Sequence, residues 1–351
     1  MTAAPPHLER LAEVHALPTA ETCTVYVAIR SVRHGVDRNN AGYYDLVVSD
    51  ASAKLAAKIW GDSRAYVEAA QAGLREGMVV KLMFTVGSFR DAVQLTVGRL
   101  RVLADGDEWQ PDAIWGAGWE LVDGLHRKTL VFDIETVPGT DLDAVPDTVA
   151  KSITRAAERS ESEVDKVMSL SPYFGKVVSL AFCDADNPEP VMAFVVPPAG
   201  REHDEYPSWI RPMSEPELLR SFWHLAYAAE LVVSFNGRGF DVPYLVIRSL
   251  IHQIPARVDL LSSPYSLRPH CDLFRLIGHG RHGLGSTSLD VVCWALGIES
   301  PKGAMDGSMV APTYARGDIE SIASYNAADV RATAAVFRHL REQLLPFRND
   351  W

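Results

Sequence analysis

The chain has 351 residues, a length that predicts about two domains, each large enough to bury its own hydrophobic core. Its composition, with 47% hydrophobic and 23% charged residues, is that of an ordinary globular protein, and no stretch approaches the ~18 consecutive apolar residues that span a bilayer. The net charge of −11 argues against a protein that coats nucleic acid by bulk charge, but it is compatible with an enzyme that has a local groove or acidic metal ligands.

The first predicted elements are mostly strands. Apolar residues alternate over 22–34, which is the period of a half-buried strand. The later elements follow in this order: strands over 43–50 and 53–60, a short helix over 62–74, and strands over 77–89 and 92–103. Five strands with a helix before the fourth are the element order of an OB-fold barrel. We therefore predict an OB-fold-like nucleic-acid-binding domain over residues 1–103, with another small barrel as the alternative.

Residues 104–127 are interpreted as a connector. The segment is rich in Gly and Asp, shows no clear period, and contains Trp109, Trp115 and Trp119. Three tryptophans predict that the connector packs on a domain instead of forming a free linker.

From residue 128 onward, predicted strands and helices alternate. Buried strands are expected over 128–136, 176–184, 190–196 and 231–236. Helices are expected over roughly 146–169, over 214–230, from about 243, and over 288–297 and 318–345. The helix over 214–230 begins with Ser214 and Glu217, the spacing of a capping box. The alternation predicts an α/β domain over 128–351 with a central mixed sheet.

The first candidate site residues lie on the strand over 128–136, where Asp133 and Glu135 are two positions apart. Residues i and i+2 of a strand face the same side. Two adjacent carboxylates are costly unless a positive charge neutralises them, and oxygen ligands of this kind suit Mg²⁺ or Mn²⁺. The alternative is a solvent-exposed strand tip that binds no metal.

Two later segments carry further candidates. A hydrophobic strand leads to Asn236, and Asp241 follows before an apolar run, where it is either a site carboxylate or a helix N-cap. Tyr325 and Asp329 lie four residues apart in the last helix and therefore share one face. An aspartate on an alanine-rich, otherwise apolar face needs a partner. The alternative is a surface pair of Tyr325 and Asp329.

The order of these motifs resembles the DEDD superfamily of 3′–5′ exonucleases, which has the ribonuclease-H-like fold of polymerase proofreading domains. The matching motifs are D-x-E on a first strand, N-x3-F-D after a later strand and Y-x3-D in a C-terminal helix, and Tyr325 is typical of the DEDDy subgroup. Four flanking segments resemble bacterial exonucleases related to family B polymerases: 171–182, 270–276, 288–298 and 302–310. The resemblance extends over about residues 128–345 and implies a DEDDy 3′–5′ exonuclease domain.

The resemblance also implies roles for individual residues. Two Mg²⁺ or Mn²⁺ ions would be held by the carboxylates of Asp133, Glu135, Asp241 and Asp329. Asp133 would bind both ions, and Tyr325 would orient the attacking water. A phenol is a poor base at pH 7, so a metal ion must lower the pKa of that water.

Substrate contacts are implied in the same way. Glu135 and the backbone at Thr136 would contact the terminal 3′-OH, which makes the enzyme exo-acting and sets its direction. Asn236 and Phe240 would line the cleft, with Phe240 packing on a terminal base or sugar.

The predicted barrel has a candidate role of its own, because OB-folds bind single strands by stacking bases on aromatic residues along a basic groove. The aromatic residues available are Tyr43, Tyr44, Trp60, Phe84 and Phe89. The basic residues available are Arg30, Arg33, Lys54, Lys58 and Lys81. Among these we single out Tyr43, Lys58 and Trp60, although Trp60 is as compatible with the core as with the surface. A structural or protein-docking role for this domain is the alternative.

The function expected from these features is metal-dependent 3′–5′ hydrolysis of single-stranded nucleic acid, DNA in preference to RNA, to nucleoside 5′-monophosphates. One alternative is a non-catalytic single-strand-binding or scaffolding protein. Another is a proofreading subunit that acts with a separate polymerase, in place of a free-standing repair or degradation enzyme.

Two other patterns in the chain resemble known binding motifs, but we do not interpret them as binding sites. Gly278, Gly280 and Gly283 match G-x-G-x-x-G, but the motif does not follow the first strand of a βαβ unit, so we reject a dinucleotide site. His270, Cys271, His279 and His282 match no common zinc spacing.

The sequence also bears on the cellular compartment. No basic patch followed by an apolar run is visible in residues 1–15, so we expect no secretory signal. The cysteines are scattered and lack C-x-x-C spacing, which favours a reducing compartment. We therefore expect a cytoplasmic protein with no membrane segment.

Overall fold

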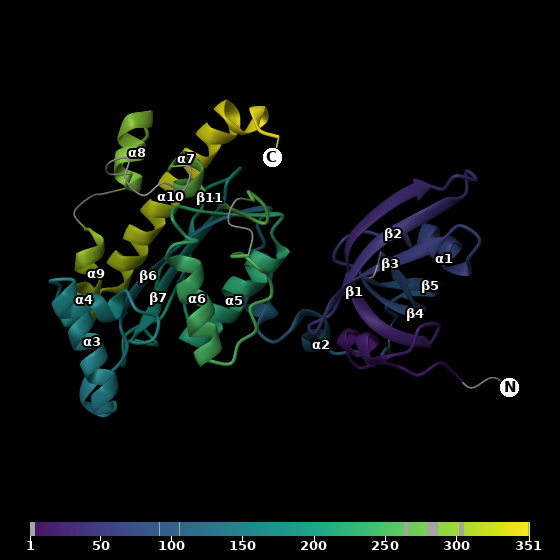
Figure 1. Cartoon of the computed structure of the whole chain (residues 1–351), viewed down its shortest axis with the longest axis horizontal. Helices are drawn as coiled ribbons and strands as arrows, with labels where there is room; N and C mark the ends of the chain where they lie inside the picture. Colours follow the sequence, from purple (N-terminus) through teal and green to yellow (C-terminus); the bar gives the residue numbers. More distant parts are fainter. Residues whose placement is uncertain are drawn as a thin grey trace. The chain divides into compact units, whose positions relative to one another are not determined.

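The chain divides into two units within the predicted connector, Met1–Trp119 and Glu120–Trp351. In Figure 1 the first unit contains a barrel and the second a sheet covered by helices. The computed structural model describes residues 4–90, 92–104, 106–262, 266–278, 287–301, 305–349 and 351.

The first unit is built on a closed five-stranded barrel with the strand order β1-β2-β3-β5-β4, so the predicted barrel is confirmed. Its strands are β1 (Thr22–Val36), β2 (Gly42–Ser49), β3 (Lys54–Trp60), β4 (Val79–Phe89) and β5 (Ala92–Val102). Helix α1 (Arg64–Ala72) lies between β3 and β4 in the sequence, as predicted. It begins after Ser63, whose side chain accepts the N–H of Tyr66, and it ends at Gly73 with φ 59.

Strict alternation decides which side chains of the barrel face outward. Along β3, Leu55 and Ile59 point into the barrel core, whereas Lys58 and Trp60 lie on the outer face. The outer face of β3 therefore presents a cation beside an aromatic ring, above a core built from Val, Leu and Ile.

The connector is shared between the two units. Asp107 accepts bonds from the Tyr26 hydroxyl at 3.1 Å and from the Arg101 guanidinium at 2.5 Å, which ties the connector to the barrel at this residue. Beyond the division, Val122 and Leu125 pack into the core of the second unit.

The second unit is built on a six-stranded sheet in the order β11-β10-β6-β7-β8-β9, which confirms the predicted mixed sheet. Its strands are β6 (Thr129–Pro138), β7 (Gly175–Asp184), β8 (Met192–Val195), β9 (Ile210–Pro212), β10 (Leu231–Ser234) and β11 (His270–Asp272). The two short edge strands β9 and β11 were not predicted. Strand β6 pairs with β7 in the antiparallel sense and with β10 in the parallel sense.

Helices cover both faces of this sheet (Figure 1). One face packs against α5 (Glu215–Ala228) and α6 (Asp241–Ile251). The other packs mainly against α10 (Ile319–Gln343), together with α7 (Leu273–Gly278), α8 (Leu289–Leu296) and α9 (Val310–Ala315). None of the helices in the described ranges is long and apolar enough to cross a membrane.

The structure refines two predicted helices. The helix expected over 146–169 consists of α3 (Asp147–Arg159) and α4 (Val164–Ser169), because the chain turns at Glu161 with φ 49. The helix expected from about residue 243 already begins at Asp241. The capping box at Ser214 is confirmed, since Ser214 and Glu217 exchange bonds between their side chains and backbone N–H groups.

Alternation along β6 sorts its residues between the two faces of the sheet. Leu130, Phe132 and Ile134 pack towards α5 and α6, whereas Val131 packs towards α10. Asp133 and Glu135 continue the Val131 row, so both carboxylates lie on the α10 face of the sheet.

A buried ion cluster joins α5, α6 and β7. Glu215 accepts two bonds from Arg248, at 2.8 and 2.6 Å, one from His252 at 2.9 Å and one from the Val177 N–H at 2.9 Å. Burial alone would raise the pKa of Glu215, but the Arg248 guanidinium and the Val177 N–H bring it below its usual value. The Arg248 guanidinium thus compensates the charge of the Glu215 carboxylate inside the core, beside strand β7.

Arg248→Met should destabilise the second unit by about 3–5 kcal/mol, because it leaves the buried Glu215 carboxylate with too little compensation. Urea unfolding at pH 7 measures this change. Arg331→Met is the matched control, since Arg331 pairs with Glu189 at the surface and its loss should cost under about 1 kcal/mol. Equal costs for the two variants would show that the buried cluster does not stabilise the unit.

Candidate active site

Three carboxylates meet between the sheet and its longest helix. Asp133 and Glu135 on β6 and Asp329 on α10 each place one oxygen within 4.8 Å of the others. A β-bulge follows Glu135 in the pairing of β6 with β7, so the ladder becomes irregular at the point where these side chains gather. All three are partly exposed, so solutes reach them from solvent.

Asp241 adjoins this group from the other side of β6. It is the first residue of α6 and is buried, and its Oδ1 accepts the N–H of Ile134 at 3.2 Å. The bonded N–H lies between Asp133 and Glu135 in the sequence, which brings the fourth predicted carboxylate next to the other three.

Burial and mutual repulsion set the protonation of the group. The pKa of Asp133 is raised well above its ordinary value by burial and then by the charges of Asp241, Asp329 and Glu135. Burial, followed by Asp329 and Asp241, raises the pKa of Glu135 in the same direction. Burial is also the main reason that the pKa of Asp241 rises to about 7. Such a group binds protons or cations strongly.

The donor set fits a hard divalent cation. Its ligand atoms are carboxylate oxygens alone, the kind that Mg²⁺ and Mn²⁺ prefer over sulfur or imidazole ligands. A divalent ion would also remove the repulsion that raises the carboxylate pKa values. Asp133, Glu135 and Asp329 would hold such an ion.

Tyr325 stands one helical turn before Asp329 on α10 and is partly buried. Burial, followed by the charges of Asp329, Glu135 and Asp133, raises the pKa of Tyr325 well above its usual value. The phenol therefore keeps its proton near pH 7 and acts as a hydrogen-bond donor. A phenol is a poor base for a water molecule at this pH.

The loop between β10 and α6 is fixed by an aspartate that sequence reasoning missed. Asp272, at the end of β11, accepts the N–H groups of Asn236 and Arg238, each at 3.0 Å. Asn236 adopts φ 63, and its amide lies close to Gly239 in the same loop. Asp272 thus holds the segment that leads into Asp241. Asp272 lies in the segment 270–276, which resembles bacterial exonucleases, but the residues that it bonds are more than thirty positions away in the sequence.

The other predicted substrate contacts lie around the same centre. Thr136 is buried, and its hydroxyl donates to the carbonyl of Ser169 at 2.8 Å. Phe240 is partly buried, with its ring 5.5 Å from that of Tyr244. The contact of Phe240 with a terminal base or sugar stays a prediction.

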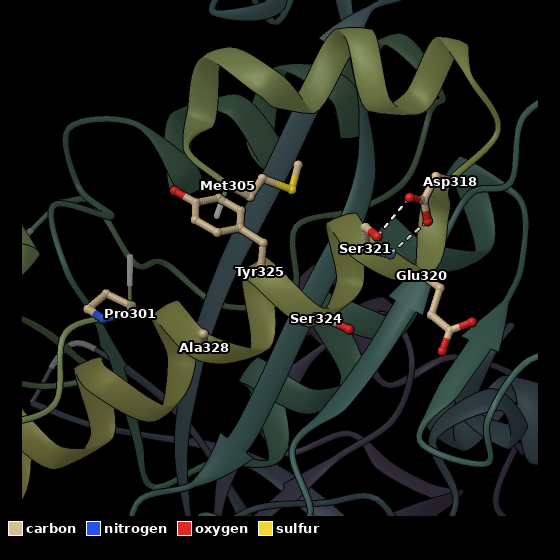
Figure 2. A pocket seen from close by; sticks show the side chains of 8 residues that line it. All are labelled: Pro301, Met305, Asp318, Glu320, Ser321, Ser324, Tyr325 and Ala328. Atoms are coloured by element: carbon tan, nitrogen blue, oxygen red, sulfur yellow. Dashed lines mark hydrogen bonds between the residues drawn. The ribbon is translucent and has the colours of Figure 1, made fainter. Parts of the chain in front are cut away.

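A hollow of about 570 Å³ lies on the open side of Tyr325. Its lining residues are Pro301, Met305, Asp318, Glu320, Ser321, Ser324, Tyr325 and Ala328. Figure 2 shows Met305 beside the Tyr325 ring and Asp318 bonded to Ser321 at the far end. Apolar and aromatic walls with acidic residues at one end suit an uncharged group better than a phosphate.

The three barrel residues singled out from the sequence lie together on its outer face. The Lys58 ammonium lies 3.7 Å from the centroid of the Tyr43 ring and 4.6 Å from that of Trp60. It also donates to Asp45 at 3.0 Å. Lys58 and Trp60 line a groove of about 650 Å³ that extends to Phe89.

Exposure separates the predicted barrel aromatics. Trp60 is 40% exposed and Phe89 is 58% exposed, so both are accessible for stacking. Phe84 is only 1% exposed and belongs to the barrel core, so listing it among the available aromatics is wrong. It faces inward because β4 alternates like β3.

The glycine motif and the histidine–cysteine set that we rejected as binding sites lie only partly within the described residues. His270 is buried and bonds to Ser234 and to the Leu260 carbonyl, and all four cysteines are buried and free. Gly280, Gly283, His279, Arg281 and His282 lie outside the described residues.

One family model matches this chain. It is described as a predicted 3′–5′ exonuclease related to the exonuclease domain of PolB, and it matches residues 170–346, just over half of the chain. The match includes Asp241, Tyr325 and Asp329, and it begins after the β6 strand that carries Asp133 and Glu135. Among curated proteins, none matches the chain.

Several solved structures are similar to the chain. A family B DNA polymerase from the archaeon Pyrobaculum calidifontis is 14% identical with a TM-score of 0.43, over 90% of this chain and 46% of the polymerase. The chain thus spans less than half of that polymerase. The second OB-fold domain of replication protein A from Methanococcus maripaludis is 10% identical with a TM-score of 0.23, over 29% of this chain and 99% of that domain.

The raised carboxylate pKa values predict a pH-dependent cost in metal-free protein. An acid whose pKa is higher in the folded state stabilises the fold fully below its unfolded pKa of ~4, and this stability is lost as the pH rises through the folded pKa. Glu135→Gln should therefore leave Tm in EDTA unchanged at pH 4 and raise it by roughly 2–4 °C at pH 8, the shift that about 1 kcal/mol produces.

Calorimetric melting at both pH values, with EDTA or with Mn²⁺, measures this difference. Mn²⁺ should raise the Tm of the unmodified protein at pH 8 more than that of Glu135→Gln. Glu230→Gln, a change of an exposed carboxylate, should behave like the unmodified protein. A Glu135→Gln variant that is less stable at pH 8 would contradict the repulsion at this site.

Proposed function

We propose a function for this chain, which belongs to the family of predicted 3′–5′ exonucleases related to the exonuclease domain of PolB. It is a metal-dependent 3′–5′ exonuclease of the DEDDy type that hydrolyses single-stranded nucleic acid. The observation that carries the proposal is the meeting of Asp133, Glu135 and Asp329 within 4.8 Å, with Asp241 beside them. Tyr325 on the same helix face as Asp329 supports the DEDDy type.

The residues would divide the chemistry as follows. Asp133, Glu135, Asp241 and Asp329 would hold two divalent ions, whose chemistry when bound would be to lower the pKa of water and to offset charge on the phosphate. Tyr325 donates its hydroxyl proton in a hydrogen bond that orients the attacking water. The water releases one proton to solvent, its oxygen bonds to phosphorus, and the bond from phosphorus to the 3′ oxygen breaks. The 3′ oxygen takes up a proton from solvent, so a nucleoside 5′-monophosphate leaves and the shortened strand has a new 3′-OH.

Recognition of the strand end would make the reaction exonucleolytic. Glu135 and the Thr136 backbone contact the terminal 3′-OH, and Asn236 and Phe240 line the cleft. The hollow beside Tyr325 takes an uncharged base or sugar, because its acidic end disfavours a phosphate (Figure 2).

We propose further that the barrel is an OB-fold that binds single-stranded nucleic acid. The strand order with α1 between β3 and β4 supports this fold. Trp60 and Phe89, which line the groove, would stack bases there. Since Asp45 is bonded to Lys58, most of the affinity would come from stacking, and it would fall only weakly with salt.

The direct test uses 5′-labelled single-stranded DNA and RNA of one sequence with Mg²⁺, Mn²⁺ or EDTA. We expect a ladder that shortens from the 3′ end, only with metal, and faster on DNA. Asp133→Asn should lower kcat at least about a thousandfold, because the ligand that would bind both ions is lost. Glu230→Gln should keep the unmodified rate. Near-normal turnover by Asp133→Asn would refute the site assignment.

The barrel proposal has its own test. Trp60→Ala should raise KM on strands of thirty nucleotides by about 5- to 100-fold, since stacking contributes ~1–3 kcal/mol per base, and should leave KM on trinucleotides unchanged. Phe347→Ala, which changes an exposed aromatic residue in the second unit, is the control. If Trp60→Ala leaves KM on long strands unchanged, the barrel does not bind the substrate through this groove.

A further inference from the structure

A buried polar chain connects the candidate site to the interior of the sheet. Ser179 on β7 donates its hydroxyl proton to Oδ1 of Asn326 at 2.9 Å, and Nδ2 of Asn326 donates to Oδ2 of Asp133 at 2.7 Å. Ser179 and Asn326 are both 0% exposed. Asn326 directly follows Tyr325 on α10, so it belongs to the same helix turn as the two residues assigned to the site.

The chemistry of the three groups fixes the direction of both bonds. A carboxylate accepts only, so the amide nitrogen of Asn326 must face Asp133. The amide oxygen then faces Ser179, whose hydroxyl is a donor. Ser179 pairs in register with Glu135 across β6 and β7, which places the first residue of these hydrogen bonds beside the site.

We propose that Asn326, oriented by Ser179, is a positioning residue that fixes the Asp133 carboxylate for metal binding. The inference rests on the proposed function. The amide occupies one lone pair of Oδ2 and leaves Oδ1 without a bond to Asn326. An anchored carboxylate presents its remaining lone pairs in one orientation, as partners behind metal ligands do.

The neutrality of the donor is part of the argument. Glu215, which has a structural role, is held by the guanidinium of Arg248. Asp133 is held by a carboxamide, which fixes its geometry without supplying a positive charge. A guanidinium in the same place would compete with a metal ion for the charge of Asp133.

The test separates positioning from stability. The double variant Ser179→Ala/Asn326→Leu replaces both polar partners with apolar groups of similar shape, which conserves core packing. Isothermal titration of the full chain with Mn²⁺, without nucleic acid, measures the effect. We expect the Kd of the double variant for Mn²⁺ to be about 10- to 100-fold higher than that of the unmodified protein. Its Tm in EDTA should be close to the unmodified value. Ser179→Ala alone should shift Kd in the same direction by less.

The matched control is Ser249→Ala, which removes another buried serine hydroxyl, one bonded to Trp223 on the opposite face of the sheet. It should leave the Mn²⁺ Kd unchanged. The proposal is overturned if the double variant binds Mn²⁺ as tightly as the unmodified protein, if Ser249→Ala weakens binding equally, or if the unmodified protein binds no Mn²⁺. Normal Mn²⁺ binding without cleavage of any strand would refute the proposed function alone and leave this inference to be judged on Kd.

Discussion

The second unit depends on one constraint. It must hold several carboxylates close together in a partly buried position. Asp133, Glu135 and Asp329 repel one another, and burial makes each charge more expensive. Packing around them must therefore hold a geometry that the metal-free protein would relax if it were free to move.

Support reaches the carboxylates from several elements. Asp272 at the end of β11 binds two backbone N–H groups of the loop before Asp241. Glu215 and Arg248 connect α5 and α6 to the backbone of β7. Each of these groups lies outside the reacting centre, yet each fixes a segment that carries or borders a site residue. The site is a property of the whole sheet and its two helix layers.

Local signals predicted much of this architecture. Alternation and apolar runs identified the five barrel strands and four of the six sheet strands, and the capping box at Ser214 located the start of α5. The short edge strands β9 and β11 were missed. The spacing of Asp133 and Glu135 placed both on one face. Asn326 and Asp272 were missed because their partners are remote in sequence, so no local period indicates them. The break at Glu161 was missed because positive φ at a non-glycine residue has no pattern of its own.

Helix α10 carries Tyr325, Asn326 and Asp329 within two turns, and alanines at 323 and 327 are buried against the sheet. The small side chains set a single spacing between this helix and β6. Any change in that spacing displaces the phenol, the amide and the carboxylate together. Natural variation therefore cannot adjust one of the three independently by moving the backbone. Gradual divergence of this chemistry would have to proceed by exchange of side chains on a helix that stays in place.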